Sequence, residues 1–185
     1  FSTIDKGGMP MTILLREPTA ERCGEIAAYR REMLEAGSSM DGCGSLRSTE
    51  DPAVWLAQVE SLRQEATCPA PWVPATQFVA LSETGRVLGM IQVRHRFNAY
   101  LERYGGHIGY SVRPSARRQG VAKEMLRQAL THCRELGLRR VLITCLEDNE
   151  ASRRTILANG GVYESTVVEP QEQERLQRYW ITLGE

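Results

Sequence analysis

The chain has 185 residues, of which 42% are hydrophobic and 25% are charged, as in ordinary globular proteins. Its 23 basic and 23 acidic side chains balance, which argues against a dedicated binder of nucleic acid or of an anionic membrane surface. No apolar run approaches the ~20 residues that a transmembrane helix needs. Length and composition therefore favour one globular domain, in which any anion site is local.

The N-terminal stretch "FSTIDKGG" lacks the apolar segment of a signal peptide. We predict that residues 1–10 are an expression remnant or a disordered N-terminus, and that residues 11–185 form one domain. The five cysteines are an odd number and include no Cys-x-x-Cys pair. We expect reduced thiols in a cytoplasmic protein, with no metal site.

The first half of the chain is predicted to hold one strand and two helices. Residues 12–18 are typical of a strand that a proline ends. Thr19 can cap a helix that continues to about Glu35, and a loop rich in glycine and serine follows. Asp51 before a proline predicts the start of a second helix, which continues to about Glu65.

The second half alternates strands and helices. A change to a period of two predicts a hairpin of strands, and an i, i+4 apolar stripe predicts a long helix after them. The element order, β-α-α-β-β-β-α-β-α-β-β, indicates a mixed α/β sheet of the α+β type. The predicted strands cover residues 77–81, 86–95, 106–112, 139–146, 162–168 and 176–183, and the predicted helices cover residues 119–136 and 149–161.

The turn "ARRQGVA" before the long helix is a candidate anion site. The first turn of a helix leaves backbone N–H groups without partners, and the helix dipole adds positive charge there. Gly120 opens the backbone to a ligand, and Arg117 and Arg118 offer forked donors that suit phosphate oxygens. The alternative is a solvated basic turn. The glycine patterns of Rossmann and P-loop nucleotide sites are absent, so those two readings lack their distinguishing residues.

Three segments of the sequence resemble the GNAT superfamily of N-acetyltransferases. Residues 117–122 match its R/Q-x-x-G-x-G/A signature, while "HIGYSVRP" and "VLITCLEDNEASRRTILANGG" resemble its fourth strand and its fifth strand with the following helix. The resemblance is closest to a bacterial subgroup known mainly as predicted acetyltransferases. It implies a mixed, mostly antiparallel central sheet of about seven strands, with helices on both faces and with strands four and five splayed apart.

The resemblance also implies where acetyl-CoA binds. The pantetheine arm would enter between the splayed strands and pair with the backbone of the fourth strand, and its diphosphate would lie on the amides of the basic turn. Asn149 would reach the cofactor, although it can equally serve as a helix N-cap. The implied cofactor residues are Tyr110, Ser111, Val112, Arg117, Arg118, Gln119, Gly120, Val121, Ala122, Lys123, Asn149 and Ser152.

The catalytic residues are less clearly marked. His107 lies close to the place where the family often carries a general base, and its unperturbed pKa suits proton removal at neutral pH. The alternative is that His107 only bonds a loop carbonyl. Many relatives protonate the leaving thiolate with a tyrosine, but Ile156 holds that position here. Ser152, Tyr110 or Tyr179 could replace it, although Tyr179 is also a candidate core residue, or water could supply the proton.

Other polar residues are weaker candidates. His95 and His132 are poorly placed for a base, Glu102 is a reserve carboxylate, and Asp41 either meets an ammonium group or belongs to a solvated turn. The leading function is transfer of an acyl group from acetyl-CoA to a primary amine of a small molecule or a peptide. The alternatives are a non-catalytic acyl-CoA sensor and a nucleotide-binding module. We expect no nucleic-acid or membrane partner, and the final strands could pair across a two-fold axis in a homodimer.

Overall fold

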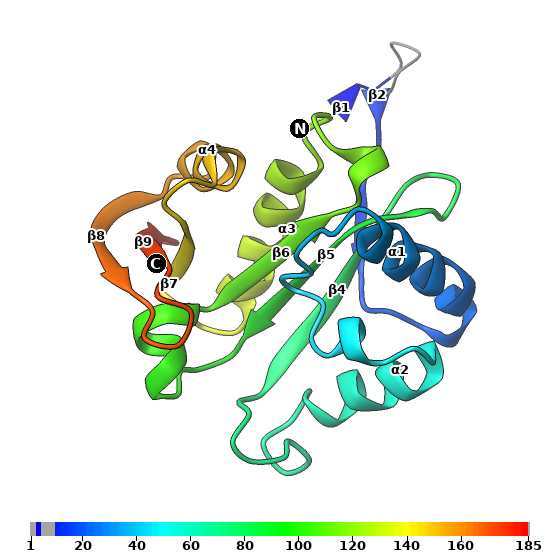
Figure 1. Ribbon diagram of the computed structural model, residues 1–185, viewed down its shortest axis with the longest axis horizontal. Coiled ribbons are helices and arrows are strands. Elements are labelled where there is room, and N and C mark those ends of the chain that lie inside the picture. Colours follow the sequence, from blue (N-terminus) through cyan, green and yellow to red (C-terminus); the bar gives the residue numbers. More distant parts are fainter. Residues whose placement is uncertain (1–2, 5–9, 185) are drawn as a thin grey trace.

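The computed structural model describes residues 3–4 and 10–184, and two antiparallel sheets form its centre (Figure 1). A sheet of four strands has the order β3-β4-β5-β6, and a sheet of three has the order β7-β9-β8. A two-stranded ribbon, β1-β2, lies at the N-terminal end. The strands are β1 (Thr3–Ile4), β2 (Pro10–Met11), β3 (Leu14–Arg16), β4 (Ala75–Leu81), β5 (Val87–Arg94), β6 (Ile108–Val112), β7 (Arg140–Leu146), β8 (Val162–Val168) and β9 (Arg175–Thr182).

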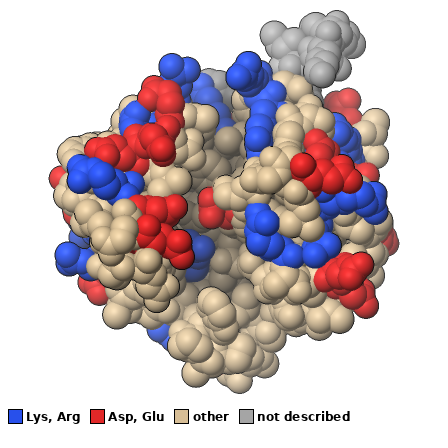
Figure 2. All heavy atoms as spheres, in the orientation of Figure 1, with Lys and Arg blue, Asp and Glu red and all other residues tan. Residues whose placement is uncertain are grey.

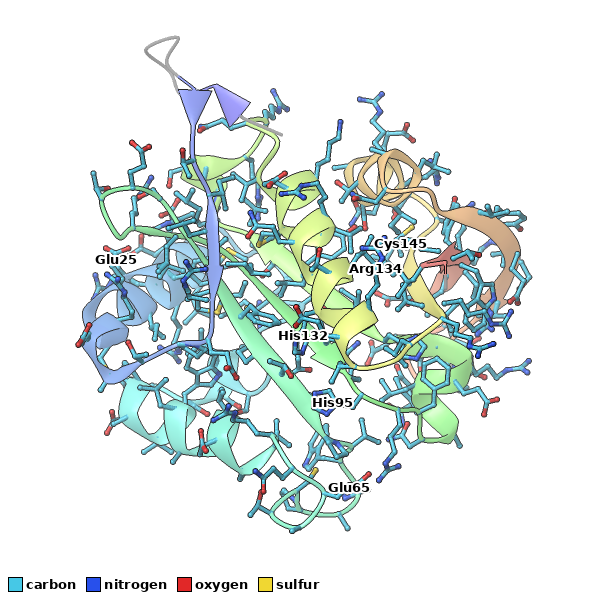
Figure 3. All side chains as sticks on the ribbon, turned by 180° about the vertical axis from the view of Figure 1, so that it is seen from behind. Glu25, Glu65, His95, His132, Arg134 and Cys145 are labelled. Atoms are coloured by element: carbon cyan, nitrogen blue, oxygen red, sulfur yellow. The ribbon has the colours of Figure 1, made fainter. Side chains whose placement is uncertain are left out.

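The four-stranded sheet has helices on both faces, as the sequence predicts. Helices α1 (Cys23–Glu35) and α2 (Pro52–Ser61) cover one face, and α3 (Val121–Glu135) covers the other, as Figures 1 and 3 show from opposite sides. The alternation of β5 matches this arrangement, since Met90 joins the core under α1 and Ile91 joins the core under α3. Helix α4 (Glu150–Ala158) packs beside α3 and β7.

The predicted stripe of α3 is confirmed. Val121, Met125, Ala129 and Cys133 are all buried, one helical turn apart. Gln128 adds a polar contact to this face, because its side chain bonds the amide of Leu15 at 3.0 Å and the carbonyl of Ile13 at 2.8 Å. The helix is thereby fixed to the edge strand β3. None of the described helices is both long and apolar enough to span a membrane.

Several element boundaries differ from the predictions. A 3-10 turn, Ala20–Arg22, precedes α1, and the Thr19 side chain caps neither element. Helix α2 ends at Ser61, four residues before the predicted end. The predicted loop before β6 contains a π-helix, Leu101–Gly105. It ends at Gly106, where a Cβ would stand 2.6 Å from the Leu142 carbonyl oxygen, so this close approach requires glycine.

The predicted splay between the fourth and fifth strands of the domain is confirmed, and it divides the structure into two sheets. The equivalent strands, β6 and β7, share no ladder in the described chain. They meet at one end only, through His107 and Leu142. Beyond that point β6 pairs with β5 on one edge, and its other edge has no strand partner among the described residues.

Two predictions stay open, one on the N-terminus and one on a homodimer. Most of residues 1–10 lie outside the described residues, so the expression-remnant prediction and the domain boundary at residue 11 are not tested. The last strand, β9, lies between β7 and β8 and has no free edge. Only β8 of the two final strands could pair across a two-fold axis, and the homodimer stays a prediction.

Candidate functional site

The N-terminus of α3 has no side-chain cap. Gly120 is its N-cap, with a left-handed φ of 78°, and no side chain of a described residue caps the helix there. Asp51 and Asn149, in contrast, cap α2 and α4 with their own oxygens. The amides at the start of α3 therefore remain open to an anionic ligand, as the sequence predicts for this turn.

The two arginines of the turn have different surroundings. Arg117 donates from Nε to the Val112 carbonyl at 2.9 Å and from Nη2 to the Ser38 hydroxyl at 2.6 Å, which ties the turn to the end of β6. Arg118 has a left-handed φ of 63° and is exposed. Lys123 lies on the exposed side of the first helical turn. Positive charge thus surrounds the open amides.

A buried hydroxyl and thiol support β6 from the side of α1. The Ser111 hydroxyl lies 2.8 Å from the Tyr29 hydroxyl and 3.3 Å from Cys43 Sγ. Burial raises the pKa of Cys43 to about 12, so its thiol stays protonated at neutral pH. Gly42 packs so closely on β6 that a Cβ there would stand 2.2 Å from the Gly109 carbonyl oxygen. The loop around residue 42 therefore forms one wall beside β6.

Tyr110 bridges the space between β6 and α4. Its hydroxyl lies 2.8 Å from the Ser152 hydroxyl and donates to the Ser152 carbonyl at 3.3 Å. Burial raises its pKa above the usual value of 10.0, so the phenol keeps its proton at neutral pH. Asn149 serves as the N-cap of α4 and accepts from the Ser152 amide at 3.1 Å. The N-cap alternative for Asn149 is confirmed, and its contact with the cofactor stays a prediction.

His107 links β6 to β7. Its amide donates to the Leu142 carbonyl at 2.8 Å, and the Leu142 amide donates to its Nδ1 at 2.9 Å. Burial, with the nearby charge of Arg94, lowers the pKa of His107 to about 4. An imidazole that accepts at Nδ1 carries its proton on Nε2 and is a donor there. The geometry therefore favours a structural role, with a strand amide as partner instead of the expected loop carbonyl.

Tyr179 lies in the core. It is 3% exposed, and its hydroxyl donates to Gln177 Oε1 at 2.8 Å. Its neighbours Arg178 and Trp180 lie on the opposite face of β9, where both bond Glu164. These contacts favour the packing alternative for Tyr179. Ile156 is fully buried in the same core, so the position where many relatives carry tyrosine is a packing position here.

His95 and His132 share one threonine on the far side of the molecule. Their Nε2 atoms lie 2.7 Å and 3.0 Å from the Thr76 hydroxyl, and Figure 3 shows both rings on the face seen from behind. This position agrees with their low rank as candidate bases. Arg94, one residue before His95, was not singled out from the sequence. The sequence feature that could have revealed it is the alternation of the strand, which places this charged residue on the same side of β5 as the residues that face α1.

The face seen in Figure 2 is hollowed between α4 and β8 on one side and α1 on the other. Atoms of both acidic and basic side chains are visible in this hollow. The contacts above place Tyr110, the Gly42 loop and the open edge of β6 together along the division between the two sheets. This arrangement can hold an extended ligand beside β6 with its anionic end at α3.

Comparison with known proteins identifies the family. The model of the acetyltransferase (GNAT) family matches residues 44–160, while none of the curated proteins matches the sequence. Similar solved structures include Mycobacterium smegmatis RimJ in complex with CoA-disulfide (19% identity, 92% of this chain and 81% of that chain, TM-score 0.70). Others are the ribosomal-protein-S5-alanine acetyltransferase of Vibrio fischeri (16%, 92% and 92%, 0.70) and an N-acetyltransferase of Staphylococcus aureus Mu50 (18%, 93% and 99%, 0.65). These structures share the fold, and since the family match spans more than half of the sequence, the chain belongs to the GNAT family of acetyltransferases.

Proposed function

We propose that this protein transfers an acetyl group from acetyl-CoA directly to a primary amine of a small molecule or a peptide. The observation that carries the proposal is the glycine-led N-terminus of α3, which has no side-chain cap and follows β6, the strand with one edge unpaired within the described chain. The open amides suit a diphosphate, and the edge of β6 that faces away from β5, along Tyr110, Ser111 and Val112, suits an extended amide-containing arm. The bound CoA-disulfide of the similar RimJ structure supports the same ligand class.

The protein's own contribution to the chemistry is orientation and proton supply. Acetyl-CoA would bring a thioester whose carbonyl carbon the amine attacks, with loss of the thiolate. Holding the two reactants together can lower the barrier by several kcal/mol, at most about 7–11 kcal/mol. We assign the proton for the thiolate to the Tyr110 hydroxyl, which is neutral and stands beside the division between the sheets. Tyr179 stays a weaker proposal for catalysis because its hydroxyl lies in the core and bonds Gln177, and His107 does so because its Nδ1 holds the Leu142 amide. The partner of the Tyr110 hydroxyl is Ser152, which is itself a proposed cofactor residue.

Replacement of Tyr110 by phenylalanine tests this assignment. We expect kcat to fall about 100-fold, within the usual range for loss of a general acid, while CoA affinity changes little. Tyr163→Phe is the matched control, because Tyr163 is an exposed tyrosine of β8 whose hydroxyl bonds Thr166. Steady-state kinetics and calorimetry with CoA measure both quantities. A Tyr110→Phe enzyme as fast as the Tyr163→Phe enzyme would remove Tyr110 from the proton transfer.

The buried Ile156 favours a second candidate, a non-catalytic acyl-CoA sensor. Release of free CoA from acetyl-CoA in the presence of an amine panel separates the two functions. Turnover with any amine supports the transferase, and tight CoA binding without turnover supports the sensor. The five free cysteines support our placement of the protein in the reducing cytoplasm.

A further inference from the structure

Arg94, the last residue of β5, lies against β6 beside the candidate site. Its Nε donates to Gln92 Oε1 at 3.2 Å, and its Nη1 donates to the carbonyls of Gly105 and Gly106 at 3.3 Å and 3.4 Å. A Cβ on Gly109 would stand 3.3 Å from Nη2, so the small residue in β6 makes room for the guanidinium. Arg94 therefore occupies the side of the sheet that faces the Gly42 loop.

The hydrogen-bond partners of Arg94 within the described chain are neutral groups. No carboxylate of a described residue forms an ion pair with it, and within the described chain its Nη2 donates no hydrogen bond. Every fully buried side-chain nitrogen and oxygen of the described residues has a partner, so Nη2 is not fully buried. Burial lowers the pKa of Arg94, and the nearby charge of Asp41 opposes this effect only in part. One nitrogen of the guanidinium, Nη2, is thus left for an anion.

This free donor is far from the proposed diphosphate site. Gly109 and Val112 are three residues apart in β6, which separates them by about 10 Å, and the α3 turn lies beyond Val112. An anion at Arg94 would therefore belong to the acceptor and not to the diphosphate. Asp41 adds a carboxylate near Arg94, in the loop that packs on Gly109. The two side chains offer opposite charges to one ligand.

We propose that the acceptor is a free α-amino acid, whose carboxylate binds Arg94 and whose amino group lies towards Asp41. The inference rests on the proposed acetyl transfer, since it names the acceptor class of the same site. Arginine suits this task because it stays charged at neutral pH and its remaining nitrogen, Nη2, can donate charge-assisted hydrogen bonds to a carboxylate. The competing role for Arg94 is a purely structural bond to the carbonyls at the end of the π-helix, and the two roles predict different kinetics.

The experiment compares amino acids with their decarboxylated amines: phenylalanine with phenethylamine, tyrosine with tyramine, histidine with histamine and lysine with cadaverine. For the wild-type protein we expect kcat/KM for the best amino acid to exceed that for its amine by at least about 10-fold, as charge-assisted hydrogen bonds allow. Arg94→Met should erase this preference by raising KM for the amino acid only. Arg94→Lys keeps the positive charge and should therefore retain part of the preference for the amino acid.

Arg96→Met is the matched control, since Arg96 is an exposed arginine two residues later whose Nη2 bonds Glu65 at 3.2 Å; Figure 3 labels Glu65 beyond the end of α2. It should keep the wild-type preference. Equal rates for amino acids and amines, or an equal loss for both in Arg94→Met, would overturn the inference and leave acetyl transfer intact. Thermal unfolding and CoA calorimetry establish that each variant is folded, and Arg94→Lys carries the test if Arg94→Met is not.

Absence of turnover with every acceptor would contradict the proposed function instead. Binding then decides the inference separately, because ligand-detected NMR with the CoA-loaded protein needs no chemistry. Selective binding of an amino acid over its amine, lost in Arg94→Met, would support the carboxylate site. Equal binding of the two ligands, or binding of neither, would refute it.

Discussion

Replacing Gly120 with glutamate should abolish CoA binding, with a loss of affinity of at least about 100-fold, or nearly 3 kcal/mol. The glutamate would place a negative charge at the N-terminus of α3, where the open amides would receive the diphosphate. It would also impose a side chain on a residue with a φ of 78°, which costs about 1–2 kcal/mol for residues other than glycine. Calorimetry with CoA measures the affinity.

Control variants separate the effects of backbone strain and of added charge from the effect of the position at the start of α3. Gly160→Glu is the matched control, because Gly160 also has a left-handed φ, of 88°, and has open space around it at the end of α4. It should lose similar stability but bind CoA like the wild-type protein. Gly120→Ala tests the strain at the site itself and should weaken CoA far less than Gly120→Glu. CoA affinity of Gly120→Glu within about threefold of the control would refute the diphosphate site, since this is under 1 kcal/mol.

The features that could be predicted from the sequence are local or periodic. The α3 stripe repeats over four helical turns, and the glycine before it marks the N-terminus in the sequence itself. The splay was predicted only through the family resemblance, because the periodicity of β6 and β7 does not say whether they share a ladder. The missing ladder between β6 and β7 divides the seven strands into two sheets.

The features that escaped prediction depend on contacts between distant residues. Ser111 bonds Tyr29, 82 residues away, and His107 bonds Leu142, 35 residues away, so no local pattern announces either pair. Arg94 and Arg96 are only two residues apart in the sequence, on either side of His95. The fold separates them, because Arg94 turns towards β6 while Arg96 meets Glu65 in solvent. Whether an arginine lies near the candidate site or in solvent depends on which side of β5 it faces and on where that strand ends.

His107 should act as a pH-sensitive clamp on the two sheets. Its pKa is about 4 in the folded protein against 6.5 in an unfolded chain, so the folded state favours the neutral ring. The stability that this provides is complete above about pH 6.5 and is lost as the pH falls towards 4, and a shift of this size corresponds to roughly 3 kcal/mol. Urea unfolding at pH 7, 6 and 5 measures the loss.

Two variants separate the clamp from general-base catalysis. In His107→Asn the side-chain oxygen can replace Nδ1 as the acceptor of the Leu142 amide without a titratable group, whereas His107→Leu leaves that buried amide unpaired. The leucine variant should therefore lose about 1–3 kcal/mol more at pH 7 than the asparagine variant. The asparagine variant should lose less stability on acidification than the wild-type protein and should keep its kcat and the pH profile of kcat. A large fall in kcat in a stable His107→Asn protein would instead assign His107 to the base, while equal acid sensitivity of wild type and His107→Asn would place the titrating group elsewhere.

Because the clamp closes one end of the division between β6 and β7, its loss should also weaken CoA binding, even though no atom of His107 needs to touch the cofactor.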